Sequence, residues 1–346
     1  MKIGVLIPRS GPAGLWGPSS EYGAILAAAE LNHAGGILGE PVELKIVDPG
    51  WTARGAAQSA ASLVEVAGVD AVVGQHPSNI RPAVARTLAG RIPYIYSAQY
   101  EGGEDRRTTI AVGGLDRDLL MPSIPWLMEK RHAKRFFLVG NDYNWPHISL
   151  PACRQIVRAA GGEVVGSEIV PWSMDDRQGL FDQITRAGAD VVVTFLVGLE
   201  AVEFNRAFAE AGLAKRIIRL ELAVDEPILH ATGADSAENL YVCLHHMLST
   251  ELREAEHFLG LYHDCFGPTA PPTSSTARSS YEGIHAVAGL ARAAKSLDIR
   301  KMKRRLGDCF ELRSVQPLLK EPAQGGRFPV HLAMADGIDL KHLRSY

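Results

Sequence analysis

Apolar residues follow two periodicities along the chain, and these alternate from its first residues onward. Residues 3–7 form a continuous apolar run, which is typical of a buried strand. Apolar residues then recur at helical spacing over residues 22–29. The hydroxyl of Ser19 or Ser20 is expected to cap this helix, and Gly35 to end it, because glycine accepts the left-handed cap conformation.

The same alternation continues through the rest of the chain, which predicts a series of strands and helices. Further strands are predicted at residues 42–47, 71–73, 94–96, 109–112, 136–139, 163–170, 191–195, 217–222 and 239–245. Further helices are predicted at residues 53–66, 80–88, 119–128, around 153–157, 181–187, 202–211, 251–265, 281–294 and 299–306. Loops are predicted at residues 141–146 and 267–275.

The order of these elements predicts the fold class. Strands that alternate with helices form parallel sheets covered on both faces. The two halves also echo each other, because residues 35–44 and 161–169 both pass from a glycine pair into a strand. We therefore predict an α/β protein with two similar doubly wound parallel-sheet lobes.

Composition narrows the function classes. The 346 residues are 46% apolar and 22% charged, which suits a globular protein of two domains. A net charge of −3 argues against direct nucleic-acid binding, and no apolar run approaches the roughly 20 residues that span a bilayer. Residues 1–8 read as a core strand and not as a signal peptide, so a cytoplasmic protein is expected.

Open parallel sheets bind ligands beyond the carboxyl ends of their strands. This rule selects the loops at residues 9–19, 75–79, 97–103, 141–146 and 197–200. The candidate side chains in or next to these loops are Trp16, His76, Ser78, Tyr96, Ser97, Tyr100, Tyr143 and Trp145. Aromatic walls with a few hydrogen-bonding groups suit a small, largely neutral solute.

Each of the main candidates has a structural alternative. Ser78 is also a typical helix N-cap, Tyr96 is also a typical core residue of a strand, and Trp145 before Pro146 also suits a brace for its loop. The gathering of these groups at strand ends favours the binding interpretation for the set.

Catalytic and cofactor signals are weak. Residues 11–17 follow a strand as a dinucleotide loop would, but they do not match GxGxxG, so a nucleotide-dependent enzyme is the less favoured class. We expect no cofactor and no metal: the adjacent His245 and His246 would point to opposite faces of a strand. The scattered Cys153, Cys243, Cys265 and Cys309 are expected to be buried, reduced thiols, and the basic run at residues 300–305 a solvated helix face.

Several segments resemble a known family. Residues 22–24 and 30–39 resemble the opening of type I periplasmic binding proteins of the branched-chain amino acid, amide and urea group. Residues 100–102, 140–146 and 190–198 look more particularly like the cytoplasmic amide sensor of the aliphatic amidase operon. Receptors that serve amide and urea transport share these features.

The resemblance implies two lobes that close on a solute about a hinge of three crossovers, near residues 114–118, 241–247 and 313–321. The first lobe would combine residues 1–115 with 247–315, and the second residues 116–246 with 316–346. It implies pocket positions, which fall on Ser78, Tyr96, Ala98, Trp145, Val197 and Gly198. Asp225 is a candidate partner for the ammonium group of an amino acid.

The chain departs from the amide sensor at three of its pocket positions. His76 replaces an aromatic residue, Ala98 a hydroxyl residue and Trp145 a tyrosine, so the solute need not be acetamide.

The sequence thus predicts a non-catalytic clamp for a small neutral or zwitterionic solute. As a cytoplasmic amide sensor it would control an antiterminator-type regulatory protein. As the alternative, it is a periplasmic receptor that docks on an ABC permease. The oligomeric state stays open, with a homodimer among the hypotheses.

Overall fold

The computed structural model describes residues 1–103, 109–174, 176–247, 253–305 and 329–346. The chain forms two compact units. Unit 1 contains Met1–Gly114 and His257–Phe328, and unit 2 contains Leu115–Glu256 and Pro329–Tyr346. The chain therefore passes between the units three times. The crossover predicted at residues 313–321 lies outside the described residues.

Unit 1 is built on a five-stranded sheet in the order β2-β1-β3-β4-β5, in which every pairing is parallel. Its strands are β1 (Lys2–Leu6), β2 (Glu43–Val47), β3 (Ala71–Gly74), β4 (Tyr94–Tyr96) and β5 (Ile110–Ala111). Its helices are α1 (Gly17–His33), α2 (Ala53–Glu65), α3 (Arg81–Leu88), α10 (Ser275–Ala294) and α11 (Ile299–Arg304), with a short 3₁₀ turn at Pro12–Trp16. Helix α9 (Arg253–Phe266) spans the boundary between the two units.

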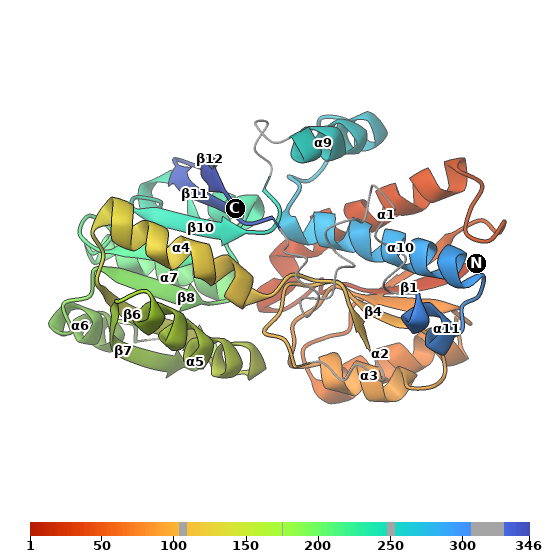
Figure 1. Ribbon diagram of the computed structural model, residues 1–346, viewed down its shortest axis with the longest axis horizontal. Coiled ribbons are helices and arrows are strands. Elements are labelled where there is room, and N and C mark those ends of the chain that lie inside the picture. The colour runs from red at the N-terminus through yellow and green to blue at the C-terminus, as the bar shows by residue number, and fades with distance from the viewer. Residues whose placement is uncertain (104–108, 175, 248–252, 306–328) are drawn as a thin grey trace. The chain divides into compact units, whose positions relative to one another are not determined.

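Helices cover both faces of the unit 1 sheet, as a doubly wound fold requires. In Figure 1, α1 and α10 lie side by side on one face, and α2 and α3 lie together on the other. The core between α1, α10 and the sheet includes Ile3, Val5, Ile95 and Ile284, all fully buried or nearly so. The predicted parallel, two-sided packing is confirmed in this unit.

The contact between α1 and α10 explains one wrong prediction. Ser19 and Ser20 do not cap α1, because the helix begins at Gly17 with a proline in its first turn. Ser19 instead shares a buried 2.8 Å hydrogen bond with Ser274, the N-cap residue of α10. The two helices approach closely at Gly23, where a Cβ atom would fall 2.1 Å from the carbonyl oxygen of Ala277.

Unit 2 is built on a seven-stranded sheet in the order β12-β11-β10-β9-β8-β6-β7. Its strands are β6 (Arg135–Asn141), β7 (Glu163–Val170), β8 (Val191–Phe195), β9 (Ile218–Glu221), β10 (Leu240–Leu244), β11 (His331–Asp336) and β12 (Asp339–Ser345). Its helices are α4 (Asp116–Arg131), α5 (Asn144–Ala159), α6 (Gln178–Arg186), α7 (Leu199–Glu210) and α8 (Glu226–Thr232), with a 3₁₀ turn at Ala234–Ser236. Figure 1 shows α4 and α5 packed together in front of this sheet.

The far edge of the unit 2 sheet departs from the predicted parallel pattern. β11 pairs antiparallel with β10, and β12 pairs antiparallel with β11, so the end of the chain completes the sheet as a hairpin. Its turn places Gly337 at a positive φ of 65°, where glycine carries little steric cost. This hairpin and helix α8 were not among the predicted elements.

Three local predictions also need correction. β10 ends at Leu244, so His245 lies beyond the strand, where its Nδ1 atom donates to the carbonyl oxygen of Pro329 over 3.0 Å. Cys153 and Cys243 are buried free thiols, but Cys265 is exposed. Cys309 lies outside the described residues. On α11 the basic side chains are exposed, apart from the half-buried Lys303.

No helix within the described ranges has both the length and the apolar character needed to cross a membrane.

Candidate functional site

The strand order fixes where each sheet can bind a ligand. In unit 1 the chain runs from β1 to its neighbour β2 and then returns to β3 on the other side of β1, so the winding reverses between β1 and β3. A crevice opens beyond the carboxyl ends of such strands. The segments that follow β3 and β4 carry His76, Ser78, Ser97, Ala98 and Tyr100, and Tyr96 ends β4.

His76 is held inside this strand-end surface by both of its ring nitrogens. Nδ1 donates to the carbonyl oxygen of Pro77 over 3.0 Å, and the Tyr94 hydroxyl lies 2.9 Å from Nε2. Since a neutral imidazole that donates from Nδ1 accepts at Nε2, the Tyr94 hydroxyl is the donor. Burial lowers the pKa of His76 to about 4, so the ring is neutral at neutral pH. His76 therefore shapes the surface and has no ring nitrogen left for a solute.

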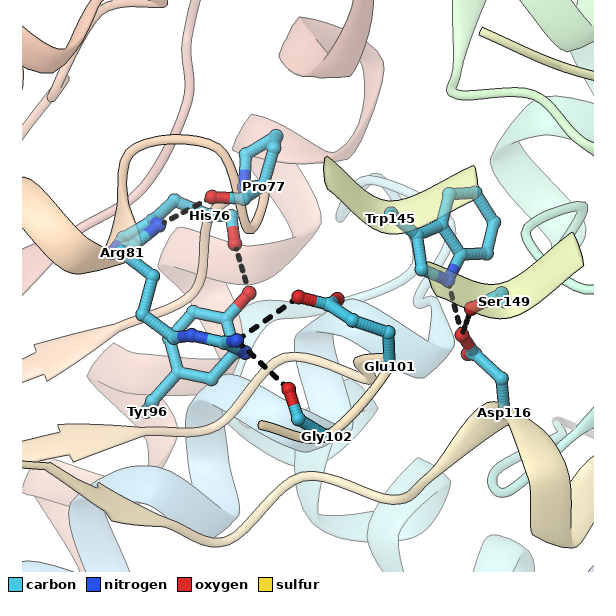
Figure 2. Close-up of polar contacts among 9 residues, drawn as sticks. All are labelled: His76, Pro77, Arg81, Tyr96, Glu101, Gly102, Asp116, Trp145 and Ser149. Carbon is cyan, nitrogen blue, oxygen red and sulfur yellow. Dashed lines mark hydrogen bonds and ion pairs between the residues drawn. The ribbon is translucent and has the colours of Figure 1, made fainter. Parts of the chain in front are cut away.

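Arg81, the first residue of α3, lies at the centre of this surface. Its guanidinium stands over the rings of Tyr96 and Tyr100, with 4.9 and 5.0 Å from Cζ to the ring centroids. Nη2 donates to Glu101 Oε1 over 3.0 Å and to the carbonyl oxygen of Gly102 over 3.1 Å (Figure 2). The Arg81 and Glu101 side chains are only 7% and 1% exposed. This buried pair is electrically neutral as a unit.

Three buried polar atoms on this surface have no hydrogen-bond partner among the described residues: Ser78 Oγ, Arg81 Nη1 and Glu101 Oε2. An unsatisfied buried polar atom costs about 1–3 kcal/mol, so such atoms in one place call for a ligand or water. Ser78 does not serve as the expected N-cap, since the cap residue of α3 is Ile80 and makes no side-chain cap bond. Arg81 Nη1 is a hydrogen-bond donor, Glu101 Oε2 is an acceptor, and Ser78 Oγ can be either.

The remaining unit 1 candidates complete the walls of this surface. Tyr96 is 1% exposed and donates its hydroxyl hydrogen to the carbonyl oxygen of His76 over 2.7 Å. Tyr100 stacks edge-on against Tyr96. The Ser97 hydroxyl donates a hydrogen bond to Gln75 Oε1 over 3.3 Å, and Ala98 is buried. The structure thus places six of the seven unit 1 candidates in or just after β3 and β4, and the seventh, Trp16, ends the 3₁₀ turn that follows β1.

Unit 2 has the corresponding reversal between β6 and β8. Asn141, the last residue of β6, connects the ends of these two strands, because its Oδ1 atom accepts a hydrogen bond from the backbone N–H of Val197 over 3.2 Å. Its Nδ2 atom is buried and makes no hydrogen bond to any described residue. Gly198 follows with a φ of 52° and is the N-cap residue of α7. Asn141 therefore offers a buried donor at the carboxyl edge of this sheet.

Trp145 lies in the first turn of α5 and not in the predicted loop. Its indole N–H donates to Asp116 Oδ2, which also accepts the hydroxyl hydrogen of Ser149 over 2.6 Å (Figure 2). The ring packs edge-on against Phe195, with centroids 5.4 Å apart. Trp145 thus links α5 to α4 and does not brace a loop, and its N–H is committed to Asp116.

Two further unit 2 candidates lie at the same edge of the sheet. Tyr143 is half-buried, and its ring lies 5.2 Å from that of Trp172. Asp225 is 1% exposed and is the N-cap residue of α8, which follows β9.

Sequence reasoning missed Arg81, Glu101, Asn141 and Trp172 as site residues. Trp172 follows the carboxyl end of β7, and the strand-end rule finds it if that edge strand is included. Asn141 and Glu101 stood inside segments already singled out, but their buried, unsatisfied state needed coordinates.

No group of three or more potential metal-ligating side chains occurs among the residues with described positions.

Comparison with known proteins is consistent with this geometry. A sequence profile described as "Periplasmic binding protein" matches residues 1–310. The chain belongs to the periplasmic binding protein family. Within it, the chain falls in the type I, branched-chain amino acid binding group. The detailed likeness to the amide sensor stays a prediction.

The relatives of this periplasmic binding protein include proteins named as Leu/Ile/Val-binding proteins. It is 25% identical over 327 residues to Leu/Ile/Val-binding protein homolog 7 of Brucella abortus, covering 88% of this chain and 80% of that protein. It is 27% identical over 241 residues to Leu/Ile/Val-binding protein BraC3 of Rhizobium johnstonii, covering 68% of this chain. The match spans 62% of the length of BraC3.

Solved structures share the fold of this periplasmic binding protein. The branched-chain amino acid binding protein LivJ of Streptococcus pneumoniae, in complex with isoleucine, superimposes with a TM-score of 0.84 at 20% identity and 99% coverage of both chains. A solute-binding protein from Rhodopseudomonas palustris HaA2, in complex with p-hydroxybenzoic acid, has a TM-score of 0.84 at 19% identity, covering 100% of this chain and 96% of that one. These likenesses establish the fold of both units.

Proposed function

We propose that this protein is the solute-binding component of an ABC-type uptake system, which takes one small solute and leaves it chemically unchanged. The named relatives are binding proteins for leucine, isoleucine and valine, and this supports the receptor role. The cytoplasmic amide sensor with a regulatory partner stays a prediction. Recovery of the native protein in a periplasmic or a cytoplasmic fraction distinguishes the two roles.

The observation that carries the proposal is the unsatisfied set on unit 1. Arg81 Nη1 is a donor, Glu101 Oε2 is an acceptor, and the Ser78 hydroxyl can act as either. A solute that satisfies all three must itself present an acceptor and a donor close together. Carboxamides, ureas and zwitterionic α-amino acids have that pattern.

The charge of the surface favours the same solutes. The Arg81–Glu101 pair has no net charge, and His76 is neutral. A simple carboxylate such as benzoate would bring an unbalanced negative charge to this surface and would have no donor for Glu101 Oε2. We therefore propose a solute that is neutral overall.

On unit 2 the proposed solute contacts are the Asn141 amide and the aromatic group of Tyr143, Trp145 and Trp172. Asn141 Nδ2 supplies a buried donor, and the aromatic rings supply apolar area for an alkyl chain. Val197, Gly198 and Asp225 lie at the same sheet edge and are proposed to line it.

A thermal-shift screen tests the proposal, with short aliphatic amides, urea, valine, isoleucine and benzoate as probes. A true ligand at 100 times its Kd raises the unfolding free energy by about 2.7 kcal/mol. We expect stabilisation by an amide, a urea or an amino acid, and intact probe on recovery. Stabilisation by the benzoate alone would refute the donor–acceptor argument, and conversion of a probe to product would refute the receptor role.

A further inference from the structure

A cavity lies in unit 2, at the opposite end of the sheet from the candidate site. It has a volume of about 390 Å³ and opens at the amino end of β9, where the buried Ile218 begins the strand. Its lining comes from the end of α4 and from the segments that precede β8, β9 and β10. The lining residues are Lys130, Arg131, His132, Asp190, Lys215, Arg216, Ile218 and Asn239. We call it the basic pocket.

The basic pocket concentrates positive charge on a chain whose net charge is −3. Two lysines and two arginines line it, against the single carboxylate of Asp190. Asp190 is already engaged, because its Oδ2 atom accepts the backbone N–H groups of Lys134 and Arg135 over 2.8 and 2.9 Å. The lining therefore carries an excess of about three positive charges at neutral pH.

Two independent segments bring these cations together. Lys130 and Arg131 end α4, where the negative end of the helix dipole favours cations, and Lys130 also pairs with Glu129 over 2.7 Å. The dipole of α4 does not explain Lys215 and Arg216, which lie in the segment between α7 and β9. These two exposed side chains make no ion pair with any residue in the described ranges.

We propose that the basic pocket binds a small polyanion that carries at least two phosphate groups. Arginine guanidinium groups present paired N–H donors that match phosphate oxygens, and lysine ammonium groups add point charge. The charge excess calls for more than one phosphate, and the volume lies within the range of small-molecule sites. Such an anion would also relieve the mutual repulsion of the four cations.

Calorimetric titration of the full chain with inorganic pyrophosphate and tripolyphosphate tests this proposal. We expect saturable binding to one site, and binding that weakens at least tenfold in Lys215→Glu/Arg216→Glu. The matched control is Arg300→Glu/Lys301→Glu on α11, which makes the same charge change on exposed residues of unit 1 and should alter the affinity less than twofold. Thermal midpoints within a few degrees of the native protein confirm that both variants fold.

Three results would overturn the proposal: no saturation at millimolar pyrophosphate, equal losses in the two double variants, or binding of an oligonucleotide but of neither phosphate probe. The solute screen is independent of this site, so failure of one proposal leaves the other intact.

Discussion

The hydroxyl of Tyr94 donates a 2.9 Å hydrogen bond to Nε2 of His76, and both side chains are buried. The bond requires a neutral imidazole, because a protonated ring has no acceptor nitrogen. Burial accordingly lowers the pKa of His76 from its ordinary value of 6.5 to about 4.

This shift predicts how stability depends on pH. Between pH 6.5 and about 4 the unfolded chain binds a proton at His76 that the folded chain does not, so the unfolding free energy falls as the pH is lowered through this window. Over the whole window, the unfolding free energy falls by about 3 kcal/mol. Urea unfolding at pH 7.5, 6 and 4.5 should show a shallower pH dependence in His76→Gln, which cannot titrate. Parallel pH dependences in the two proteins would contradict the buried neutral ring.

Close packing of α1 against α10 predicts that Gly23→Ala destabilises unit 1. The new Cβ would meet the Ala277 carbonyl oxygen at 2.1 Å, which forces the helices apart and costs about 1–3 kcal/mol or more. Gly260→Ala on α9 is the matched control, since nothing lies within 4 Å of its Cβ position. It should be neutral, or stabilising by up to about 1 kcal/mol. Equal denaturant midpoints for the two variants would rule out the close approach.

Two arginine–glutamate pairs of similar length should differ in how much they stabilise the fold. Glu101→Gln leaves the Arg81 guanidinium buried without its counter-charge and should lower the unfolding free energy by about 3 kcal/mol or more. Glu65→Gln removes the same charge from the Arg91–Glu65 pair, whose side chains are 39% and 60% exposed, and should cost less than about 1 kcal/mol. Chemical denaturation of both variants measures the difference. Similar losses would mean that Arg81 is solvated.

Removal of the Ser78 hydroxyl should affect solute binding but not the stability of the solute-free protein. Ser78 Oγ makes no hydrogen bond with the described part of the chain, so Ser78→Ala loses no protein contact. Against the solute it should cost about 1 kcal/mol, or about fivefold in Kd. Ser62→Ala, an exposed hydroxyl deletion on α2, should leave Kd unchanged. Unchanged affinity in both variants would place the solute elsewhere.

The fold was largely predictable because most of its parallel strands are short runs rich in apolar residues, such as β1, β3 and β8. Strands 163–170 and 191–195 were predicted with the boundaries that β7 and β8 have. The terminal hairpin was missed although Gly337-Ile338 forms a two-residue turn with glycine first, because its strands mix polar and apolar residues at the edge of the sheet. Ser19 was misread because its partner Ser274 is remote in sequence.

The candidate site was predictable as a region but not as a set of contacts. The strand-end rule located the segments that carry His76, Ser78 and Trp145. It could not show that His76 and Trp145 have their ring N–H groups committed to Pro77 and Asp116, while Ser78 Oγ has no hydrogen-bond partner among the described residues. Those distinctions depend on neighbours brought together by the fold.

The route of the chain also constrains its synthesis. Helix α10, which packs on β3 and β4 of unit 1, and strand β11, which pairs with β10 of unit 2, both lie beyond residue 256. A nascent chain that has emerged only as far as residue 256 therefore has a complete unit 1 sheet that still lacks its α10 cover, and a unit 2 sheet that still lacks β11 and β12. Unit 1 can cover its sheet only after α10 has emerged, and unit 2 can complete its sheet only after β11 has emerged, so both units keep apolar surface exposed through most of their synthesis.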